Sequence, residues 1–430
     1  MFSQQVPVMT AYSEKAGRFV ALLLIAGSGV VTIAKGMSLT FLAIRLQRDF
    51  GLNPASIGAL IGVGPLLGAI VSPFAGTLSD RIGRKGVLTV ALFMAGLALA
   101  GLGLAQSIAA FALAHIVSAV AAAVFEPVAR ALMSDAAPEH LRLKVFSWRY
   151  LAINAGWAIG PLIGVWVGAA YVTLFVIAGV IHAAFGLVLL LTVPEASSRQ
   201  AIETERTSGS AGGWRGLVAA LRDRRLVFFV VGGTLLLAVH GQWSVTLSQY
   251  LNTGFEDGVT LFALLVSTNA VTVLVASTPA RFVIERIGAL HALSLGSLLF
   301  LIGEIGFAAS SGMEMLVASM ILFTIGEVLV VPSEYVLVDG ISNAGNRGTY
   351  FGAHSLSTFG NFLGPLTGGL ALGAVGGAGM FLLFGAFAAA GALLFAIGHS
   401  MPPPRPEAAR TTALDDGAAT GDLLRLGQFA

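Results

Sequence analysis

The chain has 430 residues, of which 56% are hydrophobic and only 11% are Asp, Glu, Lys or Arg. Because soluble domains carry about 25% charged residues, this composition predicts an all-α integral membrane protein and excludes a soluble one. A formal net charge of +2 is too small for electrostatic binding of nucleic acid. Without cysteine, disulfides, thiolate zinc sites and cysteine-held iron–sulfur clusters are excluded as well.

Twelve apolar runs are each long enough to cross about 30 Å of hydrocarbon as a helix. The first six are Phe19–Leu42, Ser56–Thr77, Gly86–Leu104, Ile108–Met133, Tyr150–Ala170 and Val172–Val193. The other six are Leu226–Tyr250, Val259–Ala280, Ala289–Ser310, Met313–Val338, Thr349–Leu372 and Ala378–Gly398. The runs predict twelve transmembrane helices, the first of them retained rather than cleaved as a signal peptide.

The runs fall into two halves of six helices, residues 19–193 and residues 226–398. Residues 194–225 form a polar linker between them, and residues 399–430 form a tail whose composition is typical of disorder. Placing residues 1–18, the linker and the tail in the cytoplasm puts 20 of the 24 Lys and Arg residues on that side. This bias predicts that both termini are cytoplasmic.

The two halves repeat at an offset close to 205 residues. Asp80 and Arg81 return as Glu285 and Arg286, and Pro127 returns as Pro332. A duplicated six-helix unit, related by a pseudo-two-fold axis and holding a site between its halves near the midplane, is a transporter architecture.

The loop between the second and third runs resembles the signature loop of the major facilitator superfamily, G-x-x-x-D-R-x-G-R-[RK]. Every defining position is matched, by Gly76, Asp80, Arg81, Gly83, Arg84 and Lys85. Within that superfamily the chain most resembles the bacterial drug–proton antiporter (multidrug efflux) branch. The resemblance implies that Asp80 rests against the positive end of the eleventh helix as a conformational latch. The alternative is that the basic residues of the loop only fix the topology.

The same branch carries glycines that lead to G-P-x-x-G-G, and both halves contain a version of this pattern. Small residues let membrane helices approach closely, so these positions are expected to pack helices together. They are Gly156, Gly160, Pro161 and Gly164 in the fifth run, and Gly360, Gly364, Pro365, Gly368 and Gly369 in the eleventh. Val165 replaces the last glycine of the fifth run, and the proline motif of the first run is missing.

Charged side chains inside membrane helices are costly, and they are therefore usually functional. Glu126 and Arg130 lie one turn apart and are expected to pair. Glu327 has no basic neighbour on its own helix face, which makes it the better candidate for carrying a proton. His115 is a third proton-coupling candidate, with packing as its alternative role.

Other polar residues of the runs are candidates for lining a central cavity, with helix packing as the alternative. Lys35 is either one of them or extends to the membrane surface. Glu334 is either a functional carboxylate or an interfacial residue, and Glu304 is either functional or faces helix partners or lipid headgroups. The full set of lining candidates is Lys35, His240, Gln242, Trp243, Asn154, Trp157, Asn269 and Asn361.

The sequence contains no Walker A motif, no nucleophile elbow and no pair of histidines at metal-ligand spacing. We therefore expect no enzyme, cofactor or metal, but a monomeric alternating-access transporter of a bacterial inner membrane. Its partners would be the lipid bilayer, protons and a small-molecule substrate, with proton-coupled export of amphipathic or drug-like molecules favoured. A proton-coupled importer of a metabolite, an exporter dedicated to an endogenous product such as a metallophore, and a non-transporting sensor or scaffold remain as alternatives.

Overall fold

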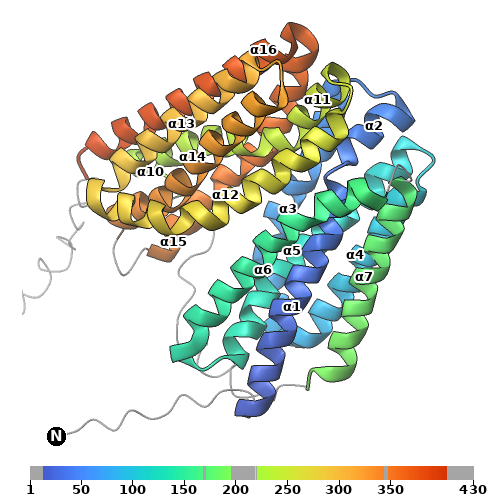
Figure 1. Cartoon of the computed structure of the whole chain (residues 1–430). Helices are drawn as coiled ribbons and strands as arrows, with labels where there is room; N and C mark the ends of the chain where they lie inside the picture. Colours follow the sequence, from blue (N-terminus) through green and yellow to red (C-terminus); the bar gives the residue numbers. More distant parts are fainter. Residues whose placement is uncertain (1–12, 168–170, 195–217, 219, 343–346, 404–430) are drawn as a thin grey trace, which may run out of the picture.

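The computed structural model describes residues 13–167, 171–194, 218, 220–342 and 347–403, and its ordered elements there are all helical. The helices form two lobes that meet at one end and diverge at the other (Figure 1). The first lobe consists of α1 (Glu14–Leu39), α2 (Leu42–Phe50), α3 (Pro54–Ile82), α4 (Arg84–Leu104), α5 (Ile108–Ala136), α6 (Glu139–Val167) and α7 (Tyr171–Thr192). The second consists of α10 (Arg224–Gln242), a π-helical turn η1 (Trp243–Leu247), α11 (Ser248–Gly254), α12 (Gly258–Ile287), α13 (Ala289–Ala309), α14 (Met313–Ile341), α15 (Arg347–His354), a 3₁₀ turn η2 (Ser355–Phe359) and α16 (Gly360–Ser400).

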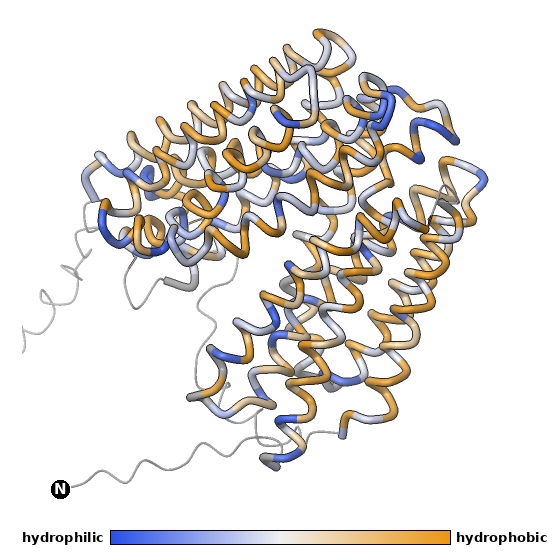
Figure 2. Tube along the Cα trace, in the orientation of Figure 1, coloured by the Kyte–Doolittle hydropathy of each residue, from blue (hydrophilic) through white to orange (hydrophobic). Residues whose placement is uncertain are grey.

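Ten stretches of described helix are long and apolar enough to cross a membrane. The longest of them, Thr349–Ser400, contains Gly376 at φ 72°, a left-handed conformation that divides α16 into two helices. Counting these two parts separately and adding the 29-residue α3 gives the twelve spans predicted. Along these spans the trace is predominantly hydrophobic, and hydrophilic residues gather at the helix ends (Figure 2).

The repeat has a structural counterpart in the turns that follow the second long helix of each lobe, α3 in the first and α12 in the second. Gly83 joins α3 to α4 at φ 99°, and Gly288 joins α12 to α13 at φ 84°. A side chain is strained at either position, so both lobes use glycine for the same tight reversal.

Glycines bring α6 onto α1 in the first lobe and α16 onto α10 in the second. A Cβ atom on Gly160 would lie 2.6 Å from the carbonyl oxygen of Ile33, and one on Gly364 would lie 2.3 Å from that of Ala238. Gly156, Gly164, Gly360 and Gly368 make similarly close approaches within their lobes, whereas Gly369 faces the backbone of Pro54 in the other lobe. The two lobes therefore use the same glycine-mediated packing of neighbouring helices.

The lobes contact each other at the end opposite Glu14 and Ser400, where α1 begins and α16 ends (Figure 1). There the side-chain amide of Asn252 on α11 donates a hydrogen bond to Gln47 on α2, at 3.1 Å. Phe41 and Ile44 of the first lobe pack with Ala263 of the second in one buried apolar cluster. The molecule is therefore closed at this end and open at the other.

A buried arginine stiffens the closed end. Arg45 on α2 is only 3% exposed, and its guanidinium donates to the last carbonyls of α4, those of Leu102 and Gly103, the latter at 2.7 Å. It also pairs with Asp49 at 3.1 Å. These carbonyls have no partner within their own helix, so Arg45 caps α4 from a neighbouring helix.

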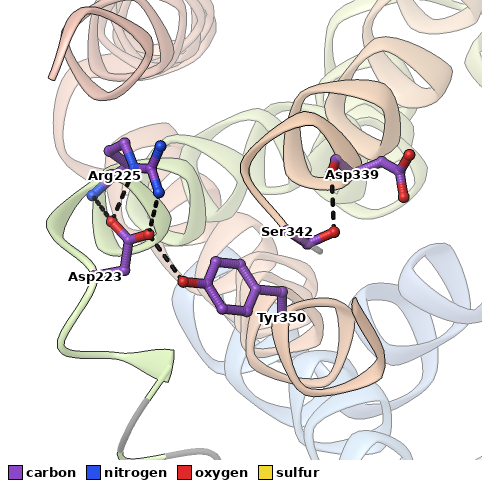
Figure 3. A network of polar contacts seen from close by, with 5 residues as sticks. All are labelled: Asp223, Arg225, Asp339, Ser342 and Tyr350. Atoms are coloured by element: carbon purple, nitrogen blue, oxygen red, sulfur yellow. Dashed lines mark hydrogen bonds and ion pairs between the residues drawn. The ribbon is translucent and has the colours of Figure 1, made fainter. Parts of the chain in front are cut away.

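At the open end, a polar network ties the start of α10 to α15 (Figure 3). The carboxylate of Asp223, the residue that caps α10, accepts hydrogen bonds from Arg225 at 2.8 and 3.1 Å and from the hydroxyl of Tyr350 at 2.9 Å. Burial raises the pKa of Asp223, but these hydrogen bonds outweigh it and hold the pKa below the usual value.

Candidate functional site

A cavity of about 680 Å³ lies between the two lobes. Its walls include parts of α1, α3, α5 and α6 from the first lobe and of α10, α12, α14 and α16 from the second. Among the predicted residues that line it are Lys35, His115, Asn154, Trp157, His240, Trp243, Asn269, Glu327 and Asn361. The duplication therefore brings together side chains that lie as much as 326 positions apart in the chain.

Glu327 faces this cavity from the second lobe and lies in a polar cluster built by three helices. One of its carboxylate oxygens lies 3.3 Å from Nε2 of His240 on α10. The other accepts a hydrogen bond from the side-chain amide of Asn269 on α12 at 3.0 Å, and that amide also donates to Thr324 at 2.9 Å. Since a histidine can gain or lose its proton near neutral pH, the charge of this cluster can change.

Glu126 of the first lobe has different partners: it pairs with Arg130 as predicted, but a second arginine, which the sequence did not indicate, lies closer. Arg130 lies at 3.6 Å from its carboxylate but is 63% exposed. The closer partner is Arg149 on α6, which donates to Glu126 at 2.8 Å and to the hydroxyl of Ser28 at 2.9 Å. Arg149 is 5% exposed, so the main charge partner of Glu126 is a buried arginine from another helix.

Since the fifth apolar run begins only at Tyr150, hydropathy predicts Arg149 outside the membrane helices, among the basic residues counted as cytoplasmic. The helix α6 in fact begins at Glu139, which places Arg149 about three turns inside it. The available signal was Pro138 followed by Glu139, since proline and acidic residues are common where helices begin.

Lys35 lines the central cavity rather than extending to the membrane surface, so that alternative is wrong. Its side chain is half-buried, near the charges of Glu126 and Arg149. Within the described part of the chain, its ammonium group has no hydrogen-bond or ion-pair partner.

The prediction that Gln242 lines the cavity is wrong. Its side chain is fully buried inside the second lobe, where its amide donates to Glu304 of α13 at 3.0 Å and its oxygen accepts from Thr246. Glu304 is also fully buried, so it faces helix partners and not the membrane interface. In this cluster the last residue of α10 contacts α13, and the π-helical turn η1 contributes Thr246.

Two other candidates have partners inside one lobe. His115 is 8% exposed and lies 3.0 Å from the carbonyl oxygen of Ile61 on α3, which fits its packing alternative as well as a place in the cavity wall. Glu334 is 6% exposed, so it is not an interfacial residue, and it lies 3.6 Å from Nε2 of His354 on α15.

The signature loop is described in part. Gly83 makes the tight turn, and Arg84, at the start of α4, forms an ion pair with Asp135 near the end of α5. Gly76 is in α3 and Lys85 in α4, whereas the side chains of Asp80 and Arg81 lie outside the described part of the structure. In the second lobe, Glu285 pairs with Arg281 at 2.8 Å on the surface, and Arg286 lies in the last turn of α12.

Comparisons with family models, relatives and solved structures all point to one family of transporters. The model of the Major Facilitator Superfamily matches residues 24–258 and 243–427. An uncharacterized MFS-type transporter of Bacillus subtilis, YqjV, is 33% identical over 79% of this chain and 83% of its own length. A Na⁺, Li⁺, K⁺/H⁺ antiporter of Planococcus maritimus is 26% identical over 77% of this chain and 84% of its own. The crystal structure of the nucleoside transporter NupG superposes with a TM-score of 0.75 at 16% identity, covering 89% of this chain and 100% of NupG.

Proposed function

Because this chain belongs to the Major Facilitator Superfamily and is a multi-pass secondary transporter rather than an enzyme, we propose that it exports small amphipathic organic molecules in exchange for protons. The observation that carries the proposal is the place of Glu327, a carboxylate in the wall of the cavity between the lobes. Its partners are a histidine and an amide, and neither is a permanent cation that would keep it ionised.

The proposed exchange is a competition at Glu327. When ionised, the carboxylate attracts a cationic group of the substrate, and when protonated it does not. A proton taken up from one side of the membrane therefore releases the substrate, and loss of the proton to the other side restores binding. Alternation of the lobes between two arrangements exposes Glu327 to each side in turn.

The proposed orientation in a bacterial inner membrane supports export. The distribution of Lys and Arg favours cytoplasmic termini, so the open end in Figure 1 would face the cytoplasm, where an exporter collects its substrate. The alternative arrangement would be held by the loop of Asp80, as the family resemblance implies. Asp80→Asn should then shift the population toward the cytoplasm-open arrangement, as read by labelling of cysteines introduced into this cysteine-free chain.

The relative from Planococcus maritimus raises a second candidate, exchange of monovalent metal cations for protons. The size of the cavity favours an organic substrate, since about 680 Å³ lies within the range of drug-sized ligand pockets. The lining also includes aromatic and apolar side chains such as Trp157, Trp243 and Phe262, which are suited to apolar surface rather than to a bare ion.

The test is uptake into inverted membrane vesicles under an imposed pH gradient, with a panel of organic cations and with Na⁺ and K⁺. We expect accumulation of one or more organic cations that collapses when a protonophore removes the gradient. Glu327→Gln should abolish it, and Glu314→Gln, a change at an exposed position in the first turn of the same helix, should not. Gradient-driven flux of Na⁺ or K⁺ alone would favour the second candidate, and no gradient-driven flux at all would contradict proton coupling.

A further inference from the structure

The wall of the central cavity has a lysine and a glutamate, on different lobes. Of the Lys, Arg, Asp and Glu residues that the structure describes, two line the cavity, Lys35 on α1 and Glu327 on α14. They belong to different lobes and do not form an ion pair with each other within 4.0 Å. One cationic and one anionic group thus face the same space from opposite walls.

Among the described residues, no carboxylate forms an ion pair with Lys35 within 4.0 Å. The nearby carboxylate of Glu126 already accepts from Arg149 at 2.8 Å and lies 3.6 Å from Arg130. Three cations therefore share one carboxylate in this part of the first lobe, which leaves an excess of positive charge. A cation without a partner inside a membrane protein is costly, so a bound anionic group at Lys35 would be favourable.

Lys35 also borders a second cavity, which is too small to hold an anionic substrate group. The space behind it, bordered by Ser118 and His182, is a cavity of only about 10 Å³, which has room for one water molecule at most. The large cavity is therefore where a counter-ion of Lys35 can bind.

The opposite wall has the complementary charge. Glu327 uses one carboxylate oxygen for His240 and the other for Asn269, and a carboxylate has about four lone-pair sites. It can therefore accept a further hydrogen bond from an ammonium group. Trp157 of the first lobe and Trp243 of the second also line the cavity, and their rings can cover an apolar group.

We propose that the substrate is a zwitterion, a molecule with a carboxylate that binds Lys35 and an ammonium group that binds Glu327, such as a short peptide with apolar side chains. The molecule would bridge the two lobes, so its binding energy would draw them together around it. This inference rests on the proposed function and names the substrate class of the same cavity. Protonation of Glu327 would weaken the ammonium contact and leave only the carboxylate held.

The test measures binding of three related compounds to the purified full-length protein: phenylalanyl-phenylalanine, its C-terminal amide and its N-acetyl derivative. The dipeptide has both charges, the amide only the positive one, and the N-acetyl derivative only the negative one. We expect the dipeptide to bind at least about tenfold more tightly than either derivative. Lys35→Met should remove this advantage over the amide without weakening amide binding, and Lys35→Arg should restore it.

The controls separate the outcomes. Lys144→Met removes a lysine that is exposed on α6 and should leave all three affinities unchanged, and thermal unfolding reports whether Lys35→Met folds. Equal affinity for dipeptide and amide, unaffected by Lys35→Met, would overturn the zwitterion proposal. Proton-driven transport of organic cations without dipeptide binding would also overturn the zwitterion proposal, but it would leave the proposed function intact. Dipeptide transport that does not depend on the pH gradient would support the zwitterion proposal and contradict proton coupling.

Discussion

Each lobe places a glutamate on its fourth long helix, Glu126 on α5 and Glu327 on α14, but the two carboxylates have opposite surroundings. Glu126 contacts two arginines, one of them buried, at 2.8 and 3.6 Å. Glu327 contacts a histidine and an asparagine at 3.3 and 3.0 Å. An arginine stays protonated in proteins, whereas a histidine does not. The first carboxylate is therefore suited to structure and the second to carrying a proton.

The comparison shows that duplication of one unit can leave glutamates on corresponding helices with different partners. The backbone devices are the same in both lobes, with a glycine turn after the second helix and glycines between neighbouring helices. The side chains around the two glutamates differ, since Glu126 pairs with arginine whereas Glu327 contacts a histidine and an asparagine.

The largest effect on folding is expected from Arg149→Met. This change leaves the carboxylate of Glu126 with the exposed Arg130 as its remaining ion-pair partner, and breaking a buried pair costs about 3–5 kcal/mol. Thermal unfolding in detergent measures the loss. Adding Glu126→Gln should recover part of it, because the uncompensated charge is then removed.

The matched control is Arg130→Met, which removes the exposed arginine at 3.6 Å and should cost less than about 1 kcal/mol. Equal destabilisation by the two substitutions would contradict the assignment of Arg149 as the main partner.

Asp223→Asn tests the polar network of Asp223, Arg225 and Tyr350 at the open end of the second lobe. The change removes charge-assisted hydrogen bonds with Arg225 and Tyr350 (Figure 3), each worth about 1.5–3 kcal/mol. Because the folded-state pKa of Asp223 is lowered, the ionised network stabilises fully above the usual aspartate pKa. That contribution is lost as pH falls through the lower folded-state pKa.

Thermal unfolding between neutral and acidic pH should therefore show a smaller acid-induced loss for Asp223→Asn than for the unaltered chain. Asp257→Asn is the control, since Asp257 precedes α12 without capping it through its side chain. An unchanged acid profile for Asp223→Asn would exclude the network as a source of pH dependence.

Substitution of the packing glycines by alanine tests whether glycine-mediated helix packing is equivalent in the two lobes. Gly160→Ala and Gly364→Ala each place a Cβ within 2.6 Å of a carbonyl oxygen, and overpacking of this kind costs about 1–3 kcal/mol. Gly86→Ala on α4 meets no atom within 4 Å and should be neutral or stabilising. A large difference between the first two variants in thermal unfolding would count against equivalent packing.

The smallest effect is expected from Asn252→Ala, which removes the hydrogen bond to Gln47 at the closed end. A loss of about 0.5–1.5 kcal/mol shifts the population toward the other arrangement by about two- to tenfold. Labelling of Ser244→Cys, a residue of the cavity wall, with a membrane-impermeant thiol reagent measures access from the closed side. Thr253→Ala, whose hydroxyl bonds within its own helix, should leave that labelling unchanged.

Hydropathy predicted the spans well because the bilayer imposes one length on every crossing helix. It failed where a helix extends beyond its apolar run, as α6 does, and this misplaced Arg149. Helical spacing found the contact of Glu126 with Arg130, since the two lie on one helix. The contacts of Glu327 with His240 and Asn269 bring together residues of three helices, and no pattern along the chain indicates them. The orientation of Gln242 toward Glu304 depends on packing inside the lobe and was missed for the same reason.

The role of Glu327 as the proton carrier is tested most directly with Glu327→Gln in proteoliposomes. Two rates are compared: accumulation of substrate driven by a pH gradient, and exchange of labelled for unlabelled substrate. Glutamine mimics the protonated carboxyl but cannot release a proton. We expect loss of accumulation driven by a pH gradient. Exchange of labelled for unlabelled substrate should need a higher substrate concentration, because the contact with Glu327 is weakened, but its rate should not depend on pH. If Glu327→Gln still concentrates substrate against its gradient with an unchanged pH profile, Glu327 does not carry the proton.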